Sequence, residues 1–139
     1  MTARETAIQN LDILQKSLAD WQRYKQKFKL EDLKQDRDVQ NMVFHAMLLC
    51  IQSAIDIAHY LIAHLNLPRP QSYRESFDIL SSYGYLDPQL AQELQDLTGF
   101  RNVLVHVYWQ LDLQRVYEIL SSKDKFLDQY KNVVTKLLR

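Results

Sequence analysis

The chain of 139 residues carries 17 basic and 17 acidic side chains, so it lacks the strong positive charge by which many proteins bind nucleic acid. Apolar residues make up 47% of the sequence, and there are only 2 glycines and 3 prolines, which excludes a disordered or turn-rich protein. This length suffices for one domain with its own core, and we expect a single domain over residues 1–139.

The features that bear on location indicate an intracellular protein. Cys50 is the one cysteine, so it cannot form a disulfide within the chain, and a buried thiol suits a reducing compartment. No N-terminal segment has the charged-then-apolar pattern of a signal peptide, and the uninterrupted apolar runs are too short to span a bilayer. We therefore expect a cytoplasmic protein with no membrane partner.

The first expected helix begins near Thr2, where Glu5 follows at the spacing of a capping box. Apolar side chains then recur at spacings of three and four, which is the pattern of one stripe of an amphipathic helix. The stripe consists of Ile8, Leu11, Leu14, Leu18, Trp21, Tyr24 and Phe28.

The second expected helix begins between Glu31 and Asp38 and is apolar nearly all round from residue 39 to residue 65. Such a helix is typical of the centre of a bundle. Its polar residues are therefore the informative ones, and four of them share one broad face: Gln52, Asp56, His59 and Tyr60.

Turn and capping residues divide the rest of the chain into three more helices. The segment 66–71 contains two prolines and is a loop, a short helix follows to Gly84, and Asp87-Pro88 begins a helix that runs towards Arg101. Asp112 is the expected cap of the last helix. These signals predict an all-α, up-and-down bundle of about five helices.

The segment 100–112, FRNVLVHVYWQLD, gathers polar groups among branched apolar residues. Arg101 and His106 are five residues apart, so on a regular helix they would point about 140° away from each other. Either the helix unwinds after Asn102, or two copies of the segment meet across a dimer axis at a shared cleft. In an unwound segment, His106 and Tyr108 would point to the same side. The two arrangements are compatible.

An arginine and a histidine together can cleave RNA. The guanidinium grips phosphate oxygens and stabilises charge that develops on them. An imidazole can take a proton from a ribose 2′-hydroxyl or give one to a leaving oxygen, so no metal is needed and DNA is spared. Asn102 could hold the phosphate or fix the tautomer of the imidazole.

The segment RNVLVHVY matches the motif Arg-x4-His-x-Tyr. In this motif the chain resembles the HepT-like toxins of the HEPN ribonuclease superfamily. The surroundings agree. The stretch IQSAIDIAHYLIAHLNLPRPQSYRESFDILSSYGYLD is similar to the second and third helices of that family. The stretch DLTGFRNVLVHVYWQLDLQRVYEIL is similar to its catalytic segment and last helix.

The resemblance implies an all-helical homodimer whose paired motifs line a cleft, acting as a metal-independent ribonuclease without a cofactor. Arg101 and His106 would be the catalytic pair, and Asn102 the polar residue that commonly follows the arginine. It also implies the toxin of a type II toxin–antitoxin system, partnered by an MntA-like nucleotidyltransferase antitoxin. That antitoxin would adenylylate Tyr108, and the bulky charged nucleotide would shut RNA out of the site.

Less specific interpretations remain beside this one. Asp56 would be costly in so apolar a helix unless paired, and either Arg101 or His106 could pair with it in a site role or in a purely structural salt bridge. His59 is a weaker candidate. Arg101 and His106 could also serve only the helix C-terminus. The alternative function is a non-catalytic helical module that binds a nucleotide or a nucleotidyltransferase partner.

Overall fold

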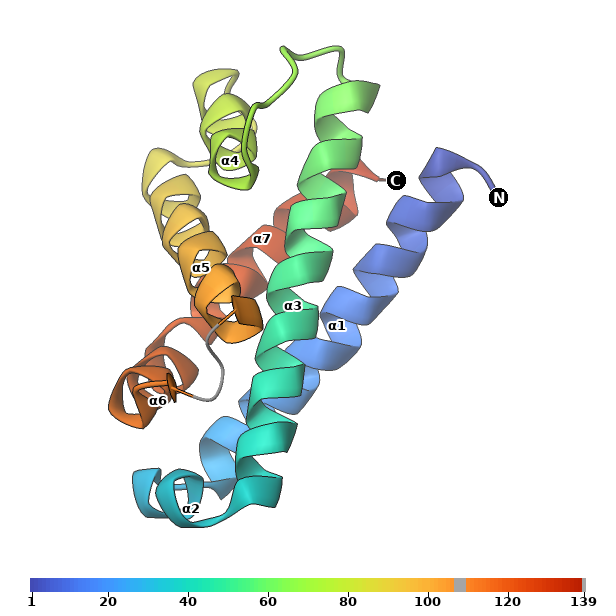
Figure 1. The fold of residues 1–139 in the computed structure, drawn as a ribbon. Coiled ribbons are helices and arrows are strands. Elements are labelled where there is room, and N and C mark those ends of the chain that lie inside the picture. The colour runs from blue at the N-terminus through green and yellow to red at the C-terminus, as the bar shows by residue number, and fades with distance from the viewer. Residues whose placement is uncertain (107–109, 139) are drawn as a thin grey trace.

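A computed structural model describes residues 1–106 and 110–138, and these residues form seven α-helices (Figure 1). This confirms the predicted all-α class. The helices are α1 (Ala3–Lys27), α2 (Leu30–Gln35), α3 (Arg37–His64), α4 (Tyr73–Ser82), α5 (Pro88–His106), α6 (Leu113–Ser122) and α7 (Asp124–Leu137).

The helix α3 forms the centre of the bundle. Figure 1 shows α1 running along one side of α3 while α5 approaches its other side, and α3 also packs against α2, α4 and α7. Contrary to the sequence-based expectation, α3 is long and apolar enough to cross a membrane. Since 61% of its most apolar stretch is buried inside the bundle, α3 is a core helix.

Hydrogen bonds at the starts of four helices confirm the caps predicted at Thr2, Asp87 and Asp112 and show a further cap at Ser72. The side chains of Thr2, Ser72, Asp87 and Asp112 each accept a hydrogen bond from a backbone N–H in the first turn of the helix that follows, at 3.0 to 3.2 Å for the shortest bond of each. Gly84 follows α4 with a φ of +87°, a conformation that glycine adopts without strain. Short-range capping chemistry therefore sets these boundaries.

The described residues form two more helices than the predicted number of about five. The short α2 precedes α3, where the carboxylate of Asp36 accepts hydrogen bonds from the N–H groups of Asp38 and Val39. The expected last helix is divided into α6 and α7 at Lys123. Neither boundary contains a glycine or a proline, and the periodicity of apolar residues continues across the second one.

Two buried aromatic side chains join helices of the bundle through hydrogen bonds to backbone carbonyls. The indole N–H of Trp21 in α1 donates to the carbonyl of Leu120 in α6 at 2.9 Å. The hydroxyl of Tyr130 in α7 donates to the carbonyl of Ala54 in α3 at 2.8 Å, and burial raises the pKa of this hydroxyl. The first contact ties α1 to α6, and the second ties α7 to the central helix α3.

Candidate functional site

Arg101 lies in α5, half-buried, and three neighbours orient its guanidinium. Its Nε donates to Oε1 of Gln52 at 2.8 Å, and Nη1 donates to Oδ1 of Asn102 at 3.1 Å. The Cζ atom lies 5.5 Å from the centre of the Tyr73 ring, within the range of a cation–π contact. Within the described residues Nη2 makes no hydrogen bond, so this end of the fork can meet an external anion.

Gln52 and Asp56, one turn apart on α3, form the support of Arg101. The amide nitrogen Nε2 of Gln52 donates to Oδ1 of Asp56 at 2.9 Å. This bond leaves the amide oxygen of Gln52 directed towards Arg101. Asp56 therefore does not form the direct ion pair with Arg101 that the sequence suggested. The side chain of Gln52 lies between the two and bonds to both. The linking role of Gln52 was missed, although its spacing of four from Asp56 was a usable signal.

His106 is the last residue of α5 and is exposed. Because α5 remains helical to this point, the hypothesis that it unwinds after Asn102 is wrong for residues 102–106. On this helix His106 points about 140° away from Arg101, and a single chain does not bring the two side chains together. The predicted modification site, Tyr108, lies outside the described residues.

An apolar groove of about 310 Å³ adjoins the polar cluster on α3 and α5. It is lined by Asn41, Phe44, His45, Leu48, Leu104 and Val105. Val105, which lines the groove, is 38% exposed, and Met42 and Leu49, two turns apart on α3, are 39% and 37% exposed, so large apolar side chains of both helices reach solvent. Leu49 lies one turn before Gln52, so this apolar face continues into the support of Arg101.

A second hollow, of about 480 Å³, lies at the C-terminal end of α3 beside the loop that leads to α4. Its lining is mainly apolar, with one imidazole and one guanidinium: His59, Ile62, Ala63, Leu67, Arg69 and Pro70. The ring of His59 lies 5.4 Å from the ring of Tyr73, which itself contacts Arg101. The predicted candidate His59 therefore borders the Arg101 cluster.

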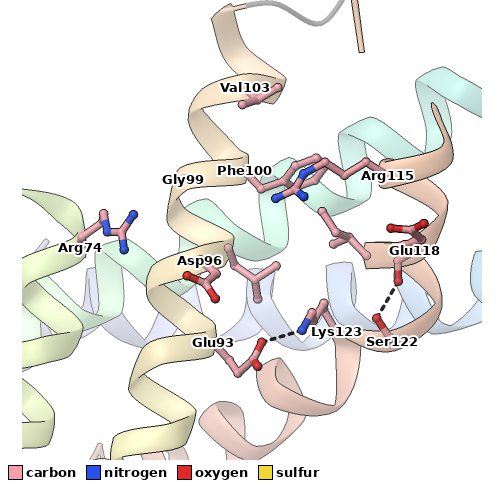
Figure 2. A pocket seen from close by; sticks show the side chains of 12 residues that line it. Arg74, Glu93, Asp96, Gly99, Phe100, Val103, Arg115, Glu118, Ser122 and Lys123 are labelled. Atoms are coloured by element: carbon pink, nitrogen blue, oxygen red, sulfur yellow. Dashed lines mark hydrogen bonds and ion pairs between the residues drawn. The ribbon is translucent and has the colours of Figure 1, made fainter. Parts of the chain in front are cut away.

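Figure 2 shows a cavity of about 550 Å³ between α5, α6 and the start of α7, with Arg74 of α4 at its edge. Its charged groups are of both signs. Lys123 donates to Glu93 at 2.8 Å across the cavity floor, and Asp96 and Glu118 stand on its walls. Arg115 lies across the opening from the α4 side. Because acidic and basic side chains both line this cavity, it does not favour the binding of a polyanion such as RNA.

Neither a metal site nor a reactive thiol is found in residues 1–106 and 110–138. No group of three or more histidine, cysteine, aspartate or glutamate side chains there could hold a metal ion. Cys50 is buried in α3, and this burial raises the pKa of its thiol to about 12, so the nucleophilic thiolate does not form at neutral pH.

The fold is that of a HEPN toxin. It superposes on the tri-AMPylated HEPN toxin of Shewanella oneidensis, solved in complex with MNT antitoxin, with a TM-score of 0.85 and 25% sequence identity. The alignment covers 98% of this chain and 99% of that toxin. YutE of Bacillus subtilis, a cytosolic protein of unknown function, has the same fold, with a TM-score of 0.83 at 19% identity.

Sequence relatives agree with the fold. The family model of HepT-like ribonucleases matches residues 14–136. The mRNA nuclease HepT of Shewanella oneidensis is 31% identical over 101 residues, which cover 73% of this chain and 76% of that protein. The tRNA nuclease HepT of Aphanizomenon flos-aquae is 30% identical over 108 residues, or 78% and 71% of the two chains. The chain belongs to the HepT-like ribonuclease family, which confirms the predicted resemblance and the predicted enzyme class.

Proposed function

We propose that the chain, as one cytoplasmic domain, is the toxin of a type II toxin–antitoxin system and cleaves RNA without a metal ion. The observation that carries this proposal is the orientation of Arg101, whose guanidinium is held on three sides while Nη2 is left for a ligand. A permanently charged, pre-oriented fork suits a phosphate that gains charge during the reaction. The HepT relatives named as mRNA and tRNA nucleases support RNA as the substrate.

The proposed reaction is an internal transesterification. Arg101 binds the scissile phosphate, and His106 accepts the proton of the adjacent ribose 2′-hydroxyl. The 2′-oxygen attacks the phosphorus, the bond from phosphorus to the 5′-oxygen breaks, and a proton returns to the leaving oxygen. The products are a 2′,3′-cyclic phosphate and a 5′-hydroxyl. Asn102, which already contacts Nη1 of Arg101, helps to hold the phosphate.

Two copies of the chain complete this site in our proposal. Arg101 and His106 lie on different sides of α5, so Arg101 of one copy needs the partner subunit's His106. The exposed apolar face around Leu49 and Val105 supports this arrangement, because it adjoins the Arg101 cluster and would be covered in a dimer. A two-fold axis through this face brings both copies of the motif to one cleft.

The proposed antitoxin is an MntA-like nucleotidyltransferase that adenylylates Tyr108. The tri-AMPylated state of the Shewanella oneidensis HEPN toxin, solved with MNT antitoxin, supports this switch. Tyr108 follows His106 by two residues, so an added nucleotide would bring negative charge close to the imidazole. That charge would repel the phosphate of an incoming RNA.

The ribonuclease proposal is tested by comparing His106→Ala with the matched variant His64→Ala, which removes an exposed imidazole from the end of α3. Cleavage of single-stranded RNA is followed in excess chelator. We expect His106→Ala to lose at least about 100-fold in rate, as for a removed general base, and His64→Ala to retain activity. Chelator-sensitive cleavage would contradict the metal-independent mechanism. Partner or nucleotide binding without any cleavage by the wild type would favour the non-catalytic module.

The switch is tested by the intact mass of the protein, expressed with and without the antitoxin. We expect a mass increase in whole AMP units only with the antitoxin, and none in Tyr108→Phe. The matched control is Tyr83→Phe, because Tyr83 is 56% exposed and stands at the end of α4. Modification of Tyr108→Phe, or no modification of the wild type, would contradict adenylylation at Tyr108.

A further inference from the structure

We propose that the hollow beside His59 is a subsite for one nucleobase of the RNA, next to the phosphate held by Arg101. The inference rests on the proposed function and adds to it a position at which the base itself is recognised. Single-stranded RNA is bound largely through stacking of its bases on aromatic and arginine side chains, in grooves that also follow the backbone charge. The hollow combines an aromatic side chain, an arginine and apolar residues in one place.

The lining of the hollow matches the chemistry of a nucleobase. Ile62, Ala63 and Leu67 provide an apolar floor for the faces of the ring system. The imidazole of His59 and the guanidinium of Arg69 are flat groups that stack on a base and hydrogen-bond to its edge. Its volume of about 480 Å³ is within the usual range of small-molecule sites.

A continuous path leads from Arg101, over Tyr73, to this hollow. The Cζ atom of Arg101 lies 5.5 Å from the centre of the Tyr73 ring, and the ring of His59 lies 5.4 Å from that of Tyr73. Tyr73 is 39% exposed, so part of its ring stays accessible between the two. A strand whose phosphate sits on Arg101 therefore passes over Tyr73, and its neighbouring base reaches the hollow.

The larger cavity of Figure 2 is the competing place for a nucleotide and fits it less well. Glu93, Asp96 and Glu118 line it, and their carboxylates repel a phosphodiester. The described lining of the hollow beside His59, by contrast, includes Arg69 and no acidic residue. Arg115, which lines the cavity of Figure 2, thus offers a matched control for Arg69.

The test uses the variant Ala63→Leu, which fills the hollow with a residue suited to a helix. Ala63 is exposed and takes no part in the hydrogen bonds of Arg101 to Gln52 and Asn102, so we expect its substitution to leave this cluster intact. The control Ala19→Leu makes the same change at an exposed position of α1. A short RNA is prepared with each nucleotide in turn made abasic, and the dissociation constant and the cleavage rate are measured for every protein.

For the wild type and Ala19→Leu, we expect one abasic position beside the cleaved phosphate to weaken binding about tenfold, as for one lost stacking contact. In Ala63→Leu the intact RNA should bind about tenfold more weakly, and the abasic position should cost nothing further. Arg69→Ala should reproduce part of this effect, and Arg115→Ala none of it.

The outcomes separate this inference from the proposed function. If the wild type cleaves RNA but no abasic position matters, or if Ala63→Leu keeps the full abasic penalty, the base subsite is wrong and the ribonuclease stands. If the wild type binds with the expected abasic penalty but never cleaves, the subsite stands and the ribonuclease is wrong. A melting temperature of Ala63→Leu equal to that of Ala19→Leu shows that folding does not cause the change.

Discussion

Two aspartates connect helices in this molecule, and their networks end differently. Asp124 at the start of α7 is buried, and it accepts hydrogen bonds from Lys25 at 3.1 Å and from Gln22 at 3.5 Å. Asp56 on α3 accepts one from Gln52, which in turn accepts one from Arg101. The first network is closed, because its cation is bound directly to its carboxylate. The second places an amide between them and leaves Nη2 of the guanidinium for a ligand.

From this difference we expect the Asp124 network to serve the stability of the fold and the Asp56 network to serve the reaction. A carboxylate that binds its cation directly compensates for its own burial and joins α1 to α7. A cation held through an amide keeps most of its charge available, because the amide oxygen carries only a partial charge. We therefore expect substitutions in the Asp124 network to affect unfolding, and substitutions in the Asp56 network to affect cleavage.

The largest effect on cleavage is expected from Arg101→Lys, in the network of Asp56, Gln52 and Arg101. Lysine keeps the charge but loses the planar fork and the bonds to Gln52 and Asn102. We expect the cleavage rate to fall about 100-fold, within the range found when one transition-state donor is removed. The melting temperature should stay within about 2 °C of the wild type, since Arg101 is half-buried. A large drop in melting temperature would instead make Arg101 a structural residue.

The closed network is tested by Asp124→Ala. Removing this carboxylate leaves Lys25 without its partner and opens the contact between α1 and α7. We expect the free energy of unfolding to fall by about 2 kcal/mol, measured by urea denaturation. Cleavage at 25 °C should be unchanged, because the network lies away from Arg101. Loss of activity without loss of stability would overturn the division between the two networks.

A smaller effect is expected for Gln52→Leu, which removes the link between Asp56 and Arg101. The guanidinium would lose one of its three orienting contacts, and we expect cleavage to slow about tenfold. The matched control is Gln92→Leu, because Gln92 donates to Asp96 at 3.1 Å in the same one-turn geometry on α5. Equal rates for the two variants would show that Gln52 does not position Arg101.

The smallest expected effect concerns Cys50 and depends on pH. Burial raises the pKa of its thiol to about 12, whereas the thiol of the unfolded chain ionises near its ordinary value of about 9. Above that value the unfolded chain binds fewer protons, so the stability due to this thiol falls as the pH rises. Relative to Cys50→Ala, the wild type should lose about 1 kcal/mol between pH 7 and pH 9.5. A constant difference in unfolding free energy would contradict the buried, neutral thiol.

Much of the fold could be predicted from local sequence signals. The caps at Thr2 and Asp112 depend on neighbouring residues, and the apolar character of α3 is visible in the chain itself. The break at Lys123 could not be predicted in the same way, because no glycine or proline marks it. Ile8 continues the expected apolar stripe of α1 but is 44% exposed, whereas its neighbour Ala7 is buried, so the buried face of this turn passes through Ala7.

The candidate site was predictable in part. The motif and its resemblance indicated Arg101 and His106, and the HepT relatives support the predicted toxin ribonuclease. Arg101 contacts Gln52, 49 positions away in the chain, and Tyr73, 28 positions away. Such contacts cannot be predicted from the periodicity of residues within one helix. The sequence left open whether the helix unwinds or two copies of the motif meet, and the helical course of α5 as far as His106 favours the second arrangement.

The central claim is that Arg101 of one copy works with the partner subunit's His106, and a mixture of inactive variants tests it most directly. Arg101→Ala and His106→Ala proteins are each assayed alone, then unfolded together, refolded as mixed dimers and assayed again. In a mixed dimer one of the two shared sites keeps both groups, so we predict that activity returns to about a quarter of the wild-type value. A mixture that stays as inactive as the separate variants would contradict a site shared between copies.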